Sequence, residues 1–99
     1  MARKLESAEI QTALARLKGW EVHDGKLART YRFRDFGDAF AFMAACALRI
    51  HALDHHPEWS NVYATVRVDL VTHDVHGITA RDVELASVME SIAGRFPQA

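Results

Sequence analysis

The side chains best suited to chemistry lie together in the stretch HALDHHPEWSN, residues 51–61. Three of the chain's six histidines, His51, His55 and His56, fall within this stretch, and a proline and a tryptophan follow them. Imidazole ordinarily titrates near neutral pH, so a cluster of histidines can exchange protons or bind a metal ion. Another histidine, His73, ends a β-rich segment in VTHDVHG, and loops that follow strands commonly carry functional groups. These four histidines define the candidate site.

Their spacing allows a metal site. His51 and His55 are four residues apart and would share one face of a helix. His73 could add a third imidazole, which is enough protein ligand for a zinc ion. The chain has no HExxH pattern and a single cysteine, so the metal pattern is weak. A simpler interpretation is that the histidines are exposed near a helix C-terminus, where they interact favourably with the helix dipole.

A proton-transfer site is the third interpretation. It requires imidazoles that line a pocket beside an aromatic wall. Trp59 could form that wall, and Asp54 or Asp74 could orient an imidazole. The local residues leave the metal and the proton-transfer interpretations open.

The composition limits the class of protein. The 99 residues are enough for one domain, residues 1–99, with 49% apolar and 25% charged side chains. A net charge of −1 gives no basic surface for nucleic acid. The N-terminus MARKLESAEI lacks the apolar core of a signal peptide, and the apolar run 39–48 is too short to span a bilayer. We therefore expect a cytoplasmic protein that binds neither nucleic acid nor membrane, with Cys46 as a buried hydrophobic residue.

The elements that position the histidines begin with a helix and a hairpin. Ser7 can cap a helix that continues through AEIQTALARLK, and Gly19 is expected to end it. The pair Asp24-Gly25 then lies between two β-rich segments and is typical of a hairpin turn.

A second helix is expected from Asp35 toward His51 or Asp54, with Pro57 as the residue that stops it. Its apolar residues recur at helical spacing along one stripe, formed by Phe36, Phe40, Met43, Ala44, Ala47, Leu48 and His51.

The segment NVYATVRVDLVTH alternates apolar and polar residues and predicts either one long strand or two shorter ones. Val66, Val68 and Leu70 would share one face, with Arg67 and Asp69 on the other. Thr79 can cap a last helix, whose expected inward residues are Val83, Ala86, Met89, Ile92 and Ala93.

This order of elements predicts an α+β fold in which an antiparallel sheet carries its helices on one face. The other face, or an edge of the sheet, would then be left without a partner. We therefore expect a homo-oligomer.

Residues 54–86, DHHPEWSNVYATVRVDLVTHDVHGITARDVELA, closely resemble the signature of the pterin-4a-carbinolamine dehydratase family. The helix DFGDAFAFM and the hairpin around GWEV and LARTYRF match as well, so the resemblance covers almost the whole chain. It implies a four-stranded antiparallel sheet with three helices on one face, in the order αββαββα, and assembly into homodimers or homotetramers. It also implies dehydration of 4a-hydroxytetrahydropterin to quinonoid dihydropterin, which regenerates the pterin cofactor of aromatic amino-acid hydroxylases. No metal or organic cofactor is implied.

The resemblance also implies a set of site residues. His55, His56 and His73 match the family's active-site histidines, with His56 and His73 as the main acid and base and His55 positioning the pterin. The matching substrate-contacting or neighbouring positions are Pro57, Trp59, Thr72, Asp74, Val75, His51, Asp54, Arg81 and Asp82. The alternative role for Trp59 is a place in the core. The alternative for Arg81 and Asp82 is a helix cap with a surface ion pair.

One position departs from the family pattern. Four residues before His55 the family usually carries a glutamate, whereas this chain carries His51. A carboxylate raises the pKa of a neighbouring imidazole, so the departure bears on the rate and the pH optimum. It also leaves the metal interpretation open. A further alternative is a protein-interaction module, because some family members bind a homeodomain transcription factor.

Overall fold

Strands and helices follow one another in the predicted order αββαββα in the computed structural model, which describes residues 2–98. A short 3-10 turn, η1, separates the last strand from the last helix. The elements are α1 Ser7–Leu14, β1 Glu21–His23, β2 Lys26–Arg32, α2 Phe36–Leu53, β3 Glu58–Val62, β4 Thr65–Leu70, η1 His73–Val75 and α3 Ala80–Ala93.

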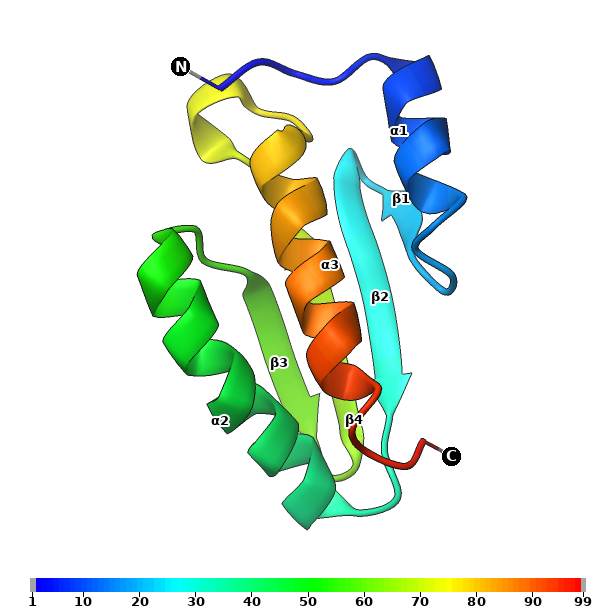
Figure 1. Ribbon diagram of the computed structural model, residues 1–99, viewed down its shortest axis with the longest axis vertical. Helices are drawn as coiled ribbons and strands as arrows, with labels where there is room; N and C mark the ends of the chain where they lie inside the picture. The colour runs from blue at the N-terminus through cyan, green and yellow to red at the C-terminus, as the bar shows by residue number, and fades with distance from the viewer. Residues whose placement is uncertain (1, 99) are drawn as a thin grey trace.

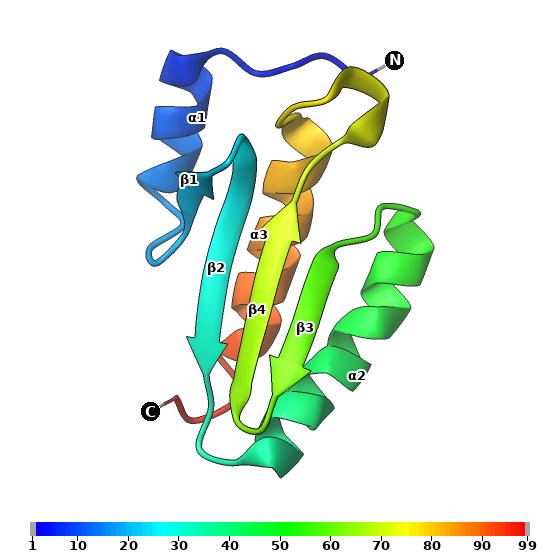
Figure 2. The ribbon, with the colours of Figure 1, turned by 180° about the vertical axis from the view of Figure 1, so that it is seen from behind.

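The four strands form one antiparallel sheet in the order β1-β2-β4-β3. The helices lie against one face of it, and the opposite face is uncovered in the described chain (Figures 1 and 2). This confirms the predicted fold class. Because β3 and β4 are sequential and antiparallel, the start of β3 and the end of β4 lie at the same end of the sheet.

Two turns set the strand pairing. Asp24 and Gly25 both have positive φ, 51° and 76°, as a tight two-residue hairpin turn requires, so the predicted turn is confirmed. A second turn at Tyr63, with φ of 49°, divides the alternating segment into β3 and β4. The sequence left open whether this segment forms one strand or two, and the structure shows two.

The core lies between the sheet and α3. Val66, Val68 and Leu70 point into it from β4 and are fully buried, as their alternation predicted. Arg67 and Asp69 lie on the uncovered face and pair with each other. Of the inward residues predicted for α3, Ala86, Met89, Ile92 and Ala93 are buried, and Val83 packs partly buried at the edge of the core.

The apolar stripe predicted for α2 is not the one that the helix buries. Its buried residues are Ala39, Phe42, Cys46 and Ile50, which confirms that Cys46 is buried. Within the predicted stripe, by contrast, the side chains of Phe36, Phe40 and Leu48 are 53%, 57% and 78% exposed. The helix is apolar almost all round, and periodicity alone therefore cannot select the inner face.

Both ends of α1 differ from the sequence expectation, whereas α2 ends within the expected range. The N-cap of α1 is Glu6, which forms a reciprocal capping box with Glu9, and Ser7 is the first helical residue. α1 ends at Leu14, ahead of Gly19, whose φ of +88° belongs to the turn before β1. α2 ends at Leu53 because Asp54 adopts the left-handed conformation, three residues before Pro57.

α2 has 18 residues and a mean hydropathy of 1.3, which by length and composition alone would allow it to cross a membrane. The apolar run 39–48 in the sequence is shorter than the helix that contains it. A core helix of a globular protein meets the same criterion, and the buried residues of α2 lie in the common core.

A buried phenol links the sheet to α3. Tyr31 is fully buried, and its hydroxyl donates to Oε1 of Glu90 at 2.6 Å. Trp20 Nε1 donates to the same oxygen at 2.9 Å. Burial, and then the Glu90 carboxylate, raise the pKa of Tyr31 far above its ordinary value.

This raised pKa predicts a loss of stability in alkali. The unfolded chain releases the tyrosine proton near pH ~10 and the folded chain keeps it, so the contribution of Tyr31 is present below that pH and falls above it. Urea unfolding between about pH 9 and about pH 11 should show the wild-type free energy of unfolding declining more steeply than that of Tyr31→Phe. Burial also raises the pKa of Cys46, to about 12, but both proteins share that thiol. Equal slopes in the two proteins would contradict the assignment.

Candidate active site

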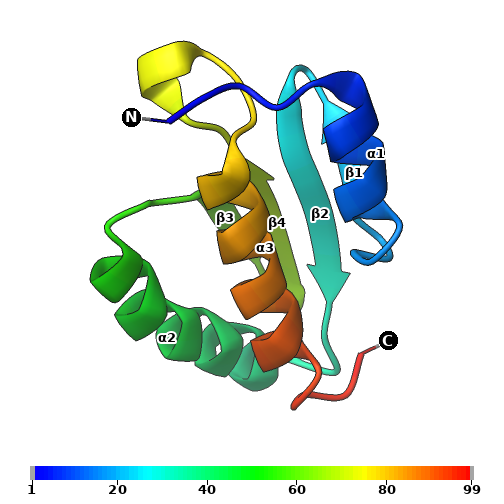
Figure 3. The same cartoon turned by 45° about the horizontal axis from the view of Figure 1, so that its top comes forward.

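Four segments meet at one end of the molecule, where the candidate histidines lie. They are the C-terminal end of α2, the start of β3, the loop after β4 and the first turn of α3 (Figures 1 and 3). The pairing of Glu58 with Asp69 brings the start of β3 beside the end of β4. The loop after β4 closes on itself through backbone hydrogen bonds between Thr72 and Gly77.

A hollow of about 210 Å³ lies between these segments. It brings together all three histidines that the family resemblance implied for the active site and four of the accompanying residues. Its lining is formed by Asp54, His55, His56, Val71, Thr72, His73, Asp74 and Arg81.

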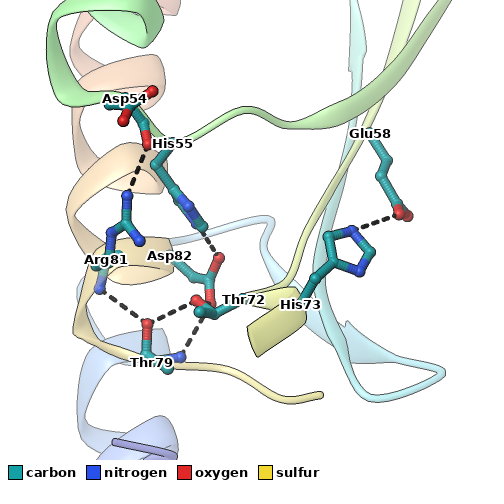
Figure 4. A network of polar contacts seen from close by, with 8 residues as sticks. All are labelled: Asp54, His55, Glu58, Thr72, His73, Thr79, Arg81 and Asp82. Carbon is teal, nitrogen blue, oxygen red and sulfur yellow. Dashed lines mark hydrogen bonds and ion pairs between the residues drawn. The ribbon is translucent and has the colours of Figure 1, made fainter. Parts of the chain in front are cut away.

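The imidazole of His55 is buried and held by a carboxylate. Its Nε2 lies 2.6 Å from Oδ1 of Asp82, which is fully buried at the start of α3 (Figure 4). A carboxylate oxygen can only accept, so Nε2 carries the proton and Nδ1 of a neutral ring is left as the acceptor. Asp82 therefore belongs to the helix cap, as the alternative expected, but its pairing with His55 is buried and not on the surface.

The second oxygen of Asp82 is held from two further segments. Oδ2 accepts from the Thr79 backbone N–H and from the Thr72 hydroxyl, both at 2.9 Å. The Thr79 hydroxyl accepts from the Arg81 N–H at 3.2 Å and lies 2.7 Å from the Thr72 hydroxyl. Since Thr72 gives its only proton to Asp82, Thr79 must donate to Thr72. The predicted cap at Thr79 is confirmed, and its capping partner is Asp82 itself.

Arg81 holds the residue that precedes His55. Its guanidinium donates from Nη2 to the backbone carbonyl of Asp54 at 2.7 Å. Asp54 is the left-handed residue that ends α2. The first turn of α3 thus fixes the end of α2 through one bond to the backbone and one to the imidazole.

The environment of His73 is much more open. Its side chain is 71% exposed, and its Nε2 lies 3.2 Å from Oε2 of Glu58 (Figure 4). Lys26 donates to the other oxygen of the same carboxylate. The hydrogen bond from Lys26, its charge, and then His73 hold the pKa of Glu58 below its usual range.

A second hollow, of about 290 Å³, adjoins the first through His56, which lines both. His51, in the last turn of α2, lies here, and the lining is more apolar. Its residues are Ala47, Ile50, His51, His56, Pro57 and Trp59. Trp59 also packs partly buried against the core, which is the alternative role expected for it.

The three-histidine metal site suggested by the spacing is not formed. Within residues 2–98 no group of three or more histidine, cysteine or acidic side chains is arranged to hold a metal ion. Nε2 of His55 is bonded to Asp82 instead, and His51 lines the other hollow.

The sequence did not predict every residue at the site, and one residue that it did predict lies outside both hollows. Val75 is in η1 and lines neither hollow. The structure adds three residues to those expected at the site: Val71 in the lining, Thr79 in the hydrogen-bond network, and Glu58 beside His73. The capping pattern Thr79-x-x-Asp82 is visible in the sequence, but the contact of Glu58 with His73 depends on strand register.

Comparison with known proteins gives relatives that all point to one family. Residues 3–92 match the family model described as pterin 4 alpha carbinolamine dehydratase. Two bacterial proteins carry pterin-4-alpha-carbinolamine dehydratase in their names. The one from Solibacter usitatus is 50% identical over 94% of this chain and 98% of its own. The one from Afipia carboxidovorans is 54% identical over 97% and 98%.

A solved structure agrees with the sequence relatives. It is a crystal structure from Brucella melitensis described as a transcriptional coactivator/pterin dehydratase. It superposes with a TM-score of 0.89 at 45% identity, over 93% of this chain and all of that one. Because the family model spans most of the chain and the relatives match over nearly their full lengths, this chain belongs to the pterin-4a-carbinolamine dehydratase family of hydro-lyases.

Proposed function

We propose that this protein dehydrates 4a-hydroxytetrahydropterin to quinonoid dihydropterin by histidine acid–base catalysis, and so serves in recycling a pterin cofactor. The observation that supports this most is the hollow that holds two imidazoles from separate segments, each beside its own carboxylate: His55 with Asp82 and His73 with Glu58. Family membership supplies the substrate class.

The reaction needs one proton donor and one proton acceptor. The bond between C4a and its hydroxyl oxygen breaks, and a protonated acid converts the leaving hydroxide to water. A base removes the N5 proton, and the electron pair of that N–H bond forms the new double bond between N5 and C4a. No net proton is gained or lost, so two imidazoles in opposite protonation states suffice.

The geometry supports a division of roles that differs from the one implied by the resemblance. His55 is buried, and its bond to Asp82 leaves Nδ1 free to accept, which suits the base. His73 is exposed and can regain a proton from solvent, which suits the acid. His56 lines both hollows, so it is the histidine best placed to position the pterin.

Turnover of 4a-hydroxytetrahydropterin generated in situ, followed by absorbance, tests the proposed activity. The wild-type protein should accelerate dehydration, and a chelator should leave the rate unchanged. His55→Ala and His73→Ala should each lower the rate about a hundredfold, the lower bound for removing general acid–base catalysis. His23→Ala, which removes an exposed histidine of β1, should retain full activity. Full activity in both site variants would contradict the proposal.

Asp82→Asn tests the positioning of His55. The asparagine amide offers His55 either a donor or a weaker acceptor and disrupts the bonds from Thr72 and Thr79, so kcat should fall at least tenfold. The free energy of unfolding should drop by about 1–3 kcal/mol, the usual loss for buried polar groups left without partners. Asp24→Asn is the matched control. Asp24 lies in an exposed turn, and asparagine tolerates the left-handed backbone conformation found there. Unchanged kcat in Asp82→Asn would exclude the positioning role.

We also propose that the chain assembles with copies of itself through α2. Phe36, Phe40 and Leu48 form an exposed apolar row on this helix, and the rings of Phe36 and Phe40 pack against each other. A group of large exposed apolar side chains on one helix is typical of an interface. A protein-interaction module would use the same face, which is the alternative carried from the sequence.

Phe40→Glu should shift the protein toward the monomer, because a carboxylate in an apolar interface is left unpaired. Sedimentation equilibrium measures the mass, and circular dichroism checks the fold. Ala8→Glu, which adds the same charge to the exposed face of α1, should leave the mass unchanged. A wild-type protein that sediments as a monomer would contradict self-association through α2.

A further inference from the structure

The antiparallel sheet brings three ionisable side chains to the edge of the hollow from three different strands or loops. Glu58 begins β3, and Lys26 begins β2. Both strands run antiparallel to β4, so their first residues lie beside its last ones. His73 follows β4 by three residues. The strand register, rather than proximity in sequence, creates this group.

The side chain of Glu58 bridges the other two. One of its oxygens accepts from Lys26 Nζ, and the other lies 3.2 Å from Nε2 of His73. Lys26 is therefore placed to fix the carboxylate, and the carboxylate to fix the imidazole. Lys26 lies on the uncovered face of the sheet, away from the core.

We propose that Glu58 is the positioning residue for His73 in the dehydration reaction and that Lys26 fixes Glu58 in the orientation that this requires. The inference rests on the proposed function, in which His73 is the proton donor. Neither Glu58 nor Lys26 lines the hollow. Glu58 therefore acts through the His73 imidazole, and Lys26 acts through Glu58.

This arrangement differs physically from the one that holds His55. Asp82 is fully buried and accepts from three donors, whereas the side chains of Glu58 and His73 are 43% and 71% exposed. Exposed charge pairs are screened by salt and buried ones far less. The lowered pKa of Glu58 keeps it ionised at neutral pH, as the bridge requires. The two imidazoles should therefore respond differently to ionic strength.

The test measures kcat and KM for Glu58→Gln and Lys26→Gln, alone and combined with His73→Ala. Glu58→Gln should lower kcat about two- to fivefold, the range for an exposed pair, with little change in KM. Lys26→Gln should lower kcat less. The deficit of Glu58→Gln should shrink at about 1 M salt, where the Debye length is about 3 Å, whereas that of Asp82→Asn should persist.

Glu21→Gln is the matched control. Across the four strands, Glu21 lies in register with Glu58 through Ala28 and Asp69. Glu21 therefore carries the same charge as Glu58 on the same face of the sheet. It should leave kcat unchanged. If Glu58→Gln lowers kcat no more than Glu21→Gln does, or by the same factor in the His73→Ala background, the positioning role is overturned.

A second readout separates this inference from the proposed function. In an NMR spectrum of the histidine ring protons, Glu58→Gln and Lys26→Gln should both move the His73 resonances, and Glu21→Gln should not. Wild-type protein without dehydratase activity would reject the proposed function while this measurement still tested the contact. Unmoved His73 resonances would overturn the positioning of His73 by Glu58, whatever the activity.

Discussion

The fully buried carboxylate of Asp82 is the interaction on which the site depends. Its two oxygens accept from His55 at the end of α2, from Thr72 after β4 and from the backbone of Thr79 before α3. Burying an ionised carboxylate is unfavourable unless its hydrogen bonds are satisfied. Here two of the donors, Thr72 and Thr79, lie within ten residues of Asp82, and the third, His55, lies 27 residues away at the end of α2. The requirement to satisfy one charge therefore also fixes the position of the His55 imidazole.

The two carboxylate–imidazole pairs place the hollow between a rigid side and an open one. His55 is enclosed, and the bond from Arg81 to the Asp54 carbonyl fixes the backbone just before it. His73 stands on a short closed loop with solvent around its ring. A base that must keep one tautomer benefits from the first environment. An acid that must be reprotonated at every turnover benefits from the second, so the asymmetry of the structure suits the proposed reaction.

The sequence predicted those features that rest on local rules. The hairpin at Asp24-Gly25, the cap at Thr79 and the alternation of Val66, Val68 and Leu70 follow from turn, capping and strand periodicities, and the structure confirms them. Prediction from the sequence failed where an element satisfies a local rule in more than one way. α2 is apolar on nearly every face, so the expected stripe through Phe40 and Leu48 proved to be the exposed one. The contact of Glu58 with His73 depends on strand register, which no local pattern encodes.

The central claim is that the hollow between α2, the loop after β4 and α3 receives a pterin. The most direct measurement is NMR mapping of backbone and imidazole resonances during titration with a stable dihydropterin. The account predicts that the largest shifts fall on His55, His56 and His73, with smaller ones at Thr72 and Arg81. Shifts concentrated instead on the groove between α1 and α3, around Arg16 and Ser87, would contradict it.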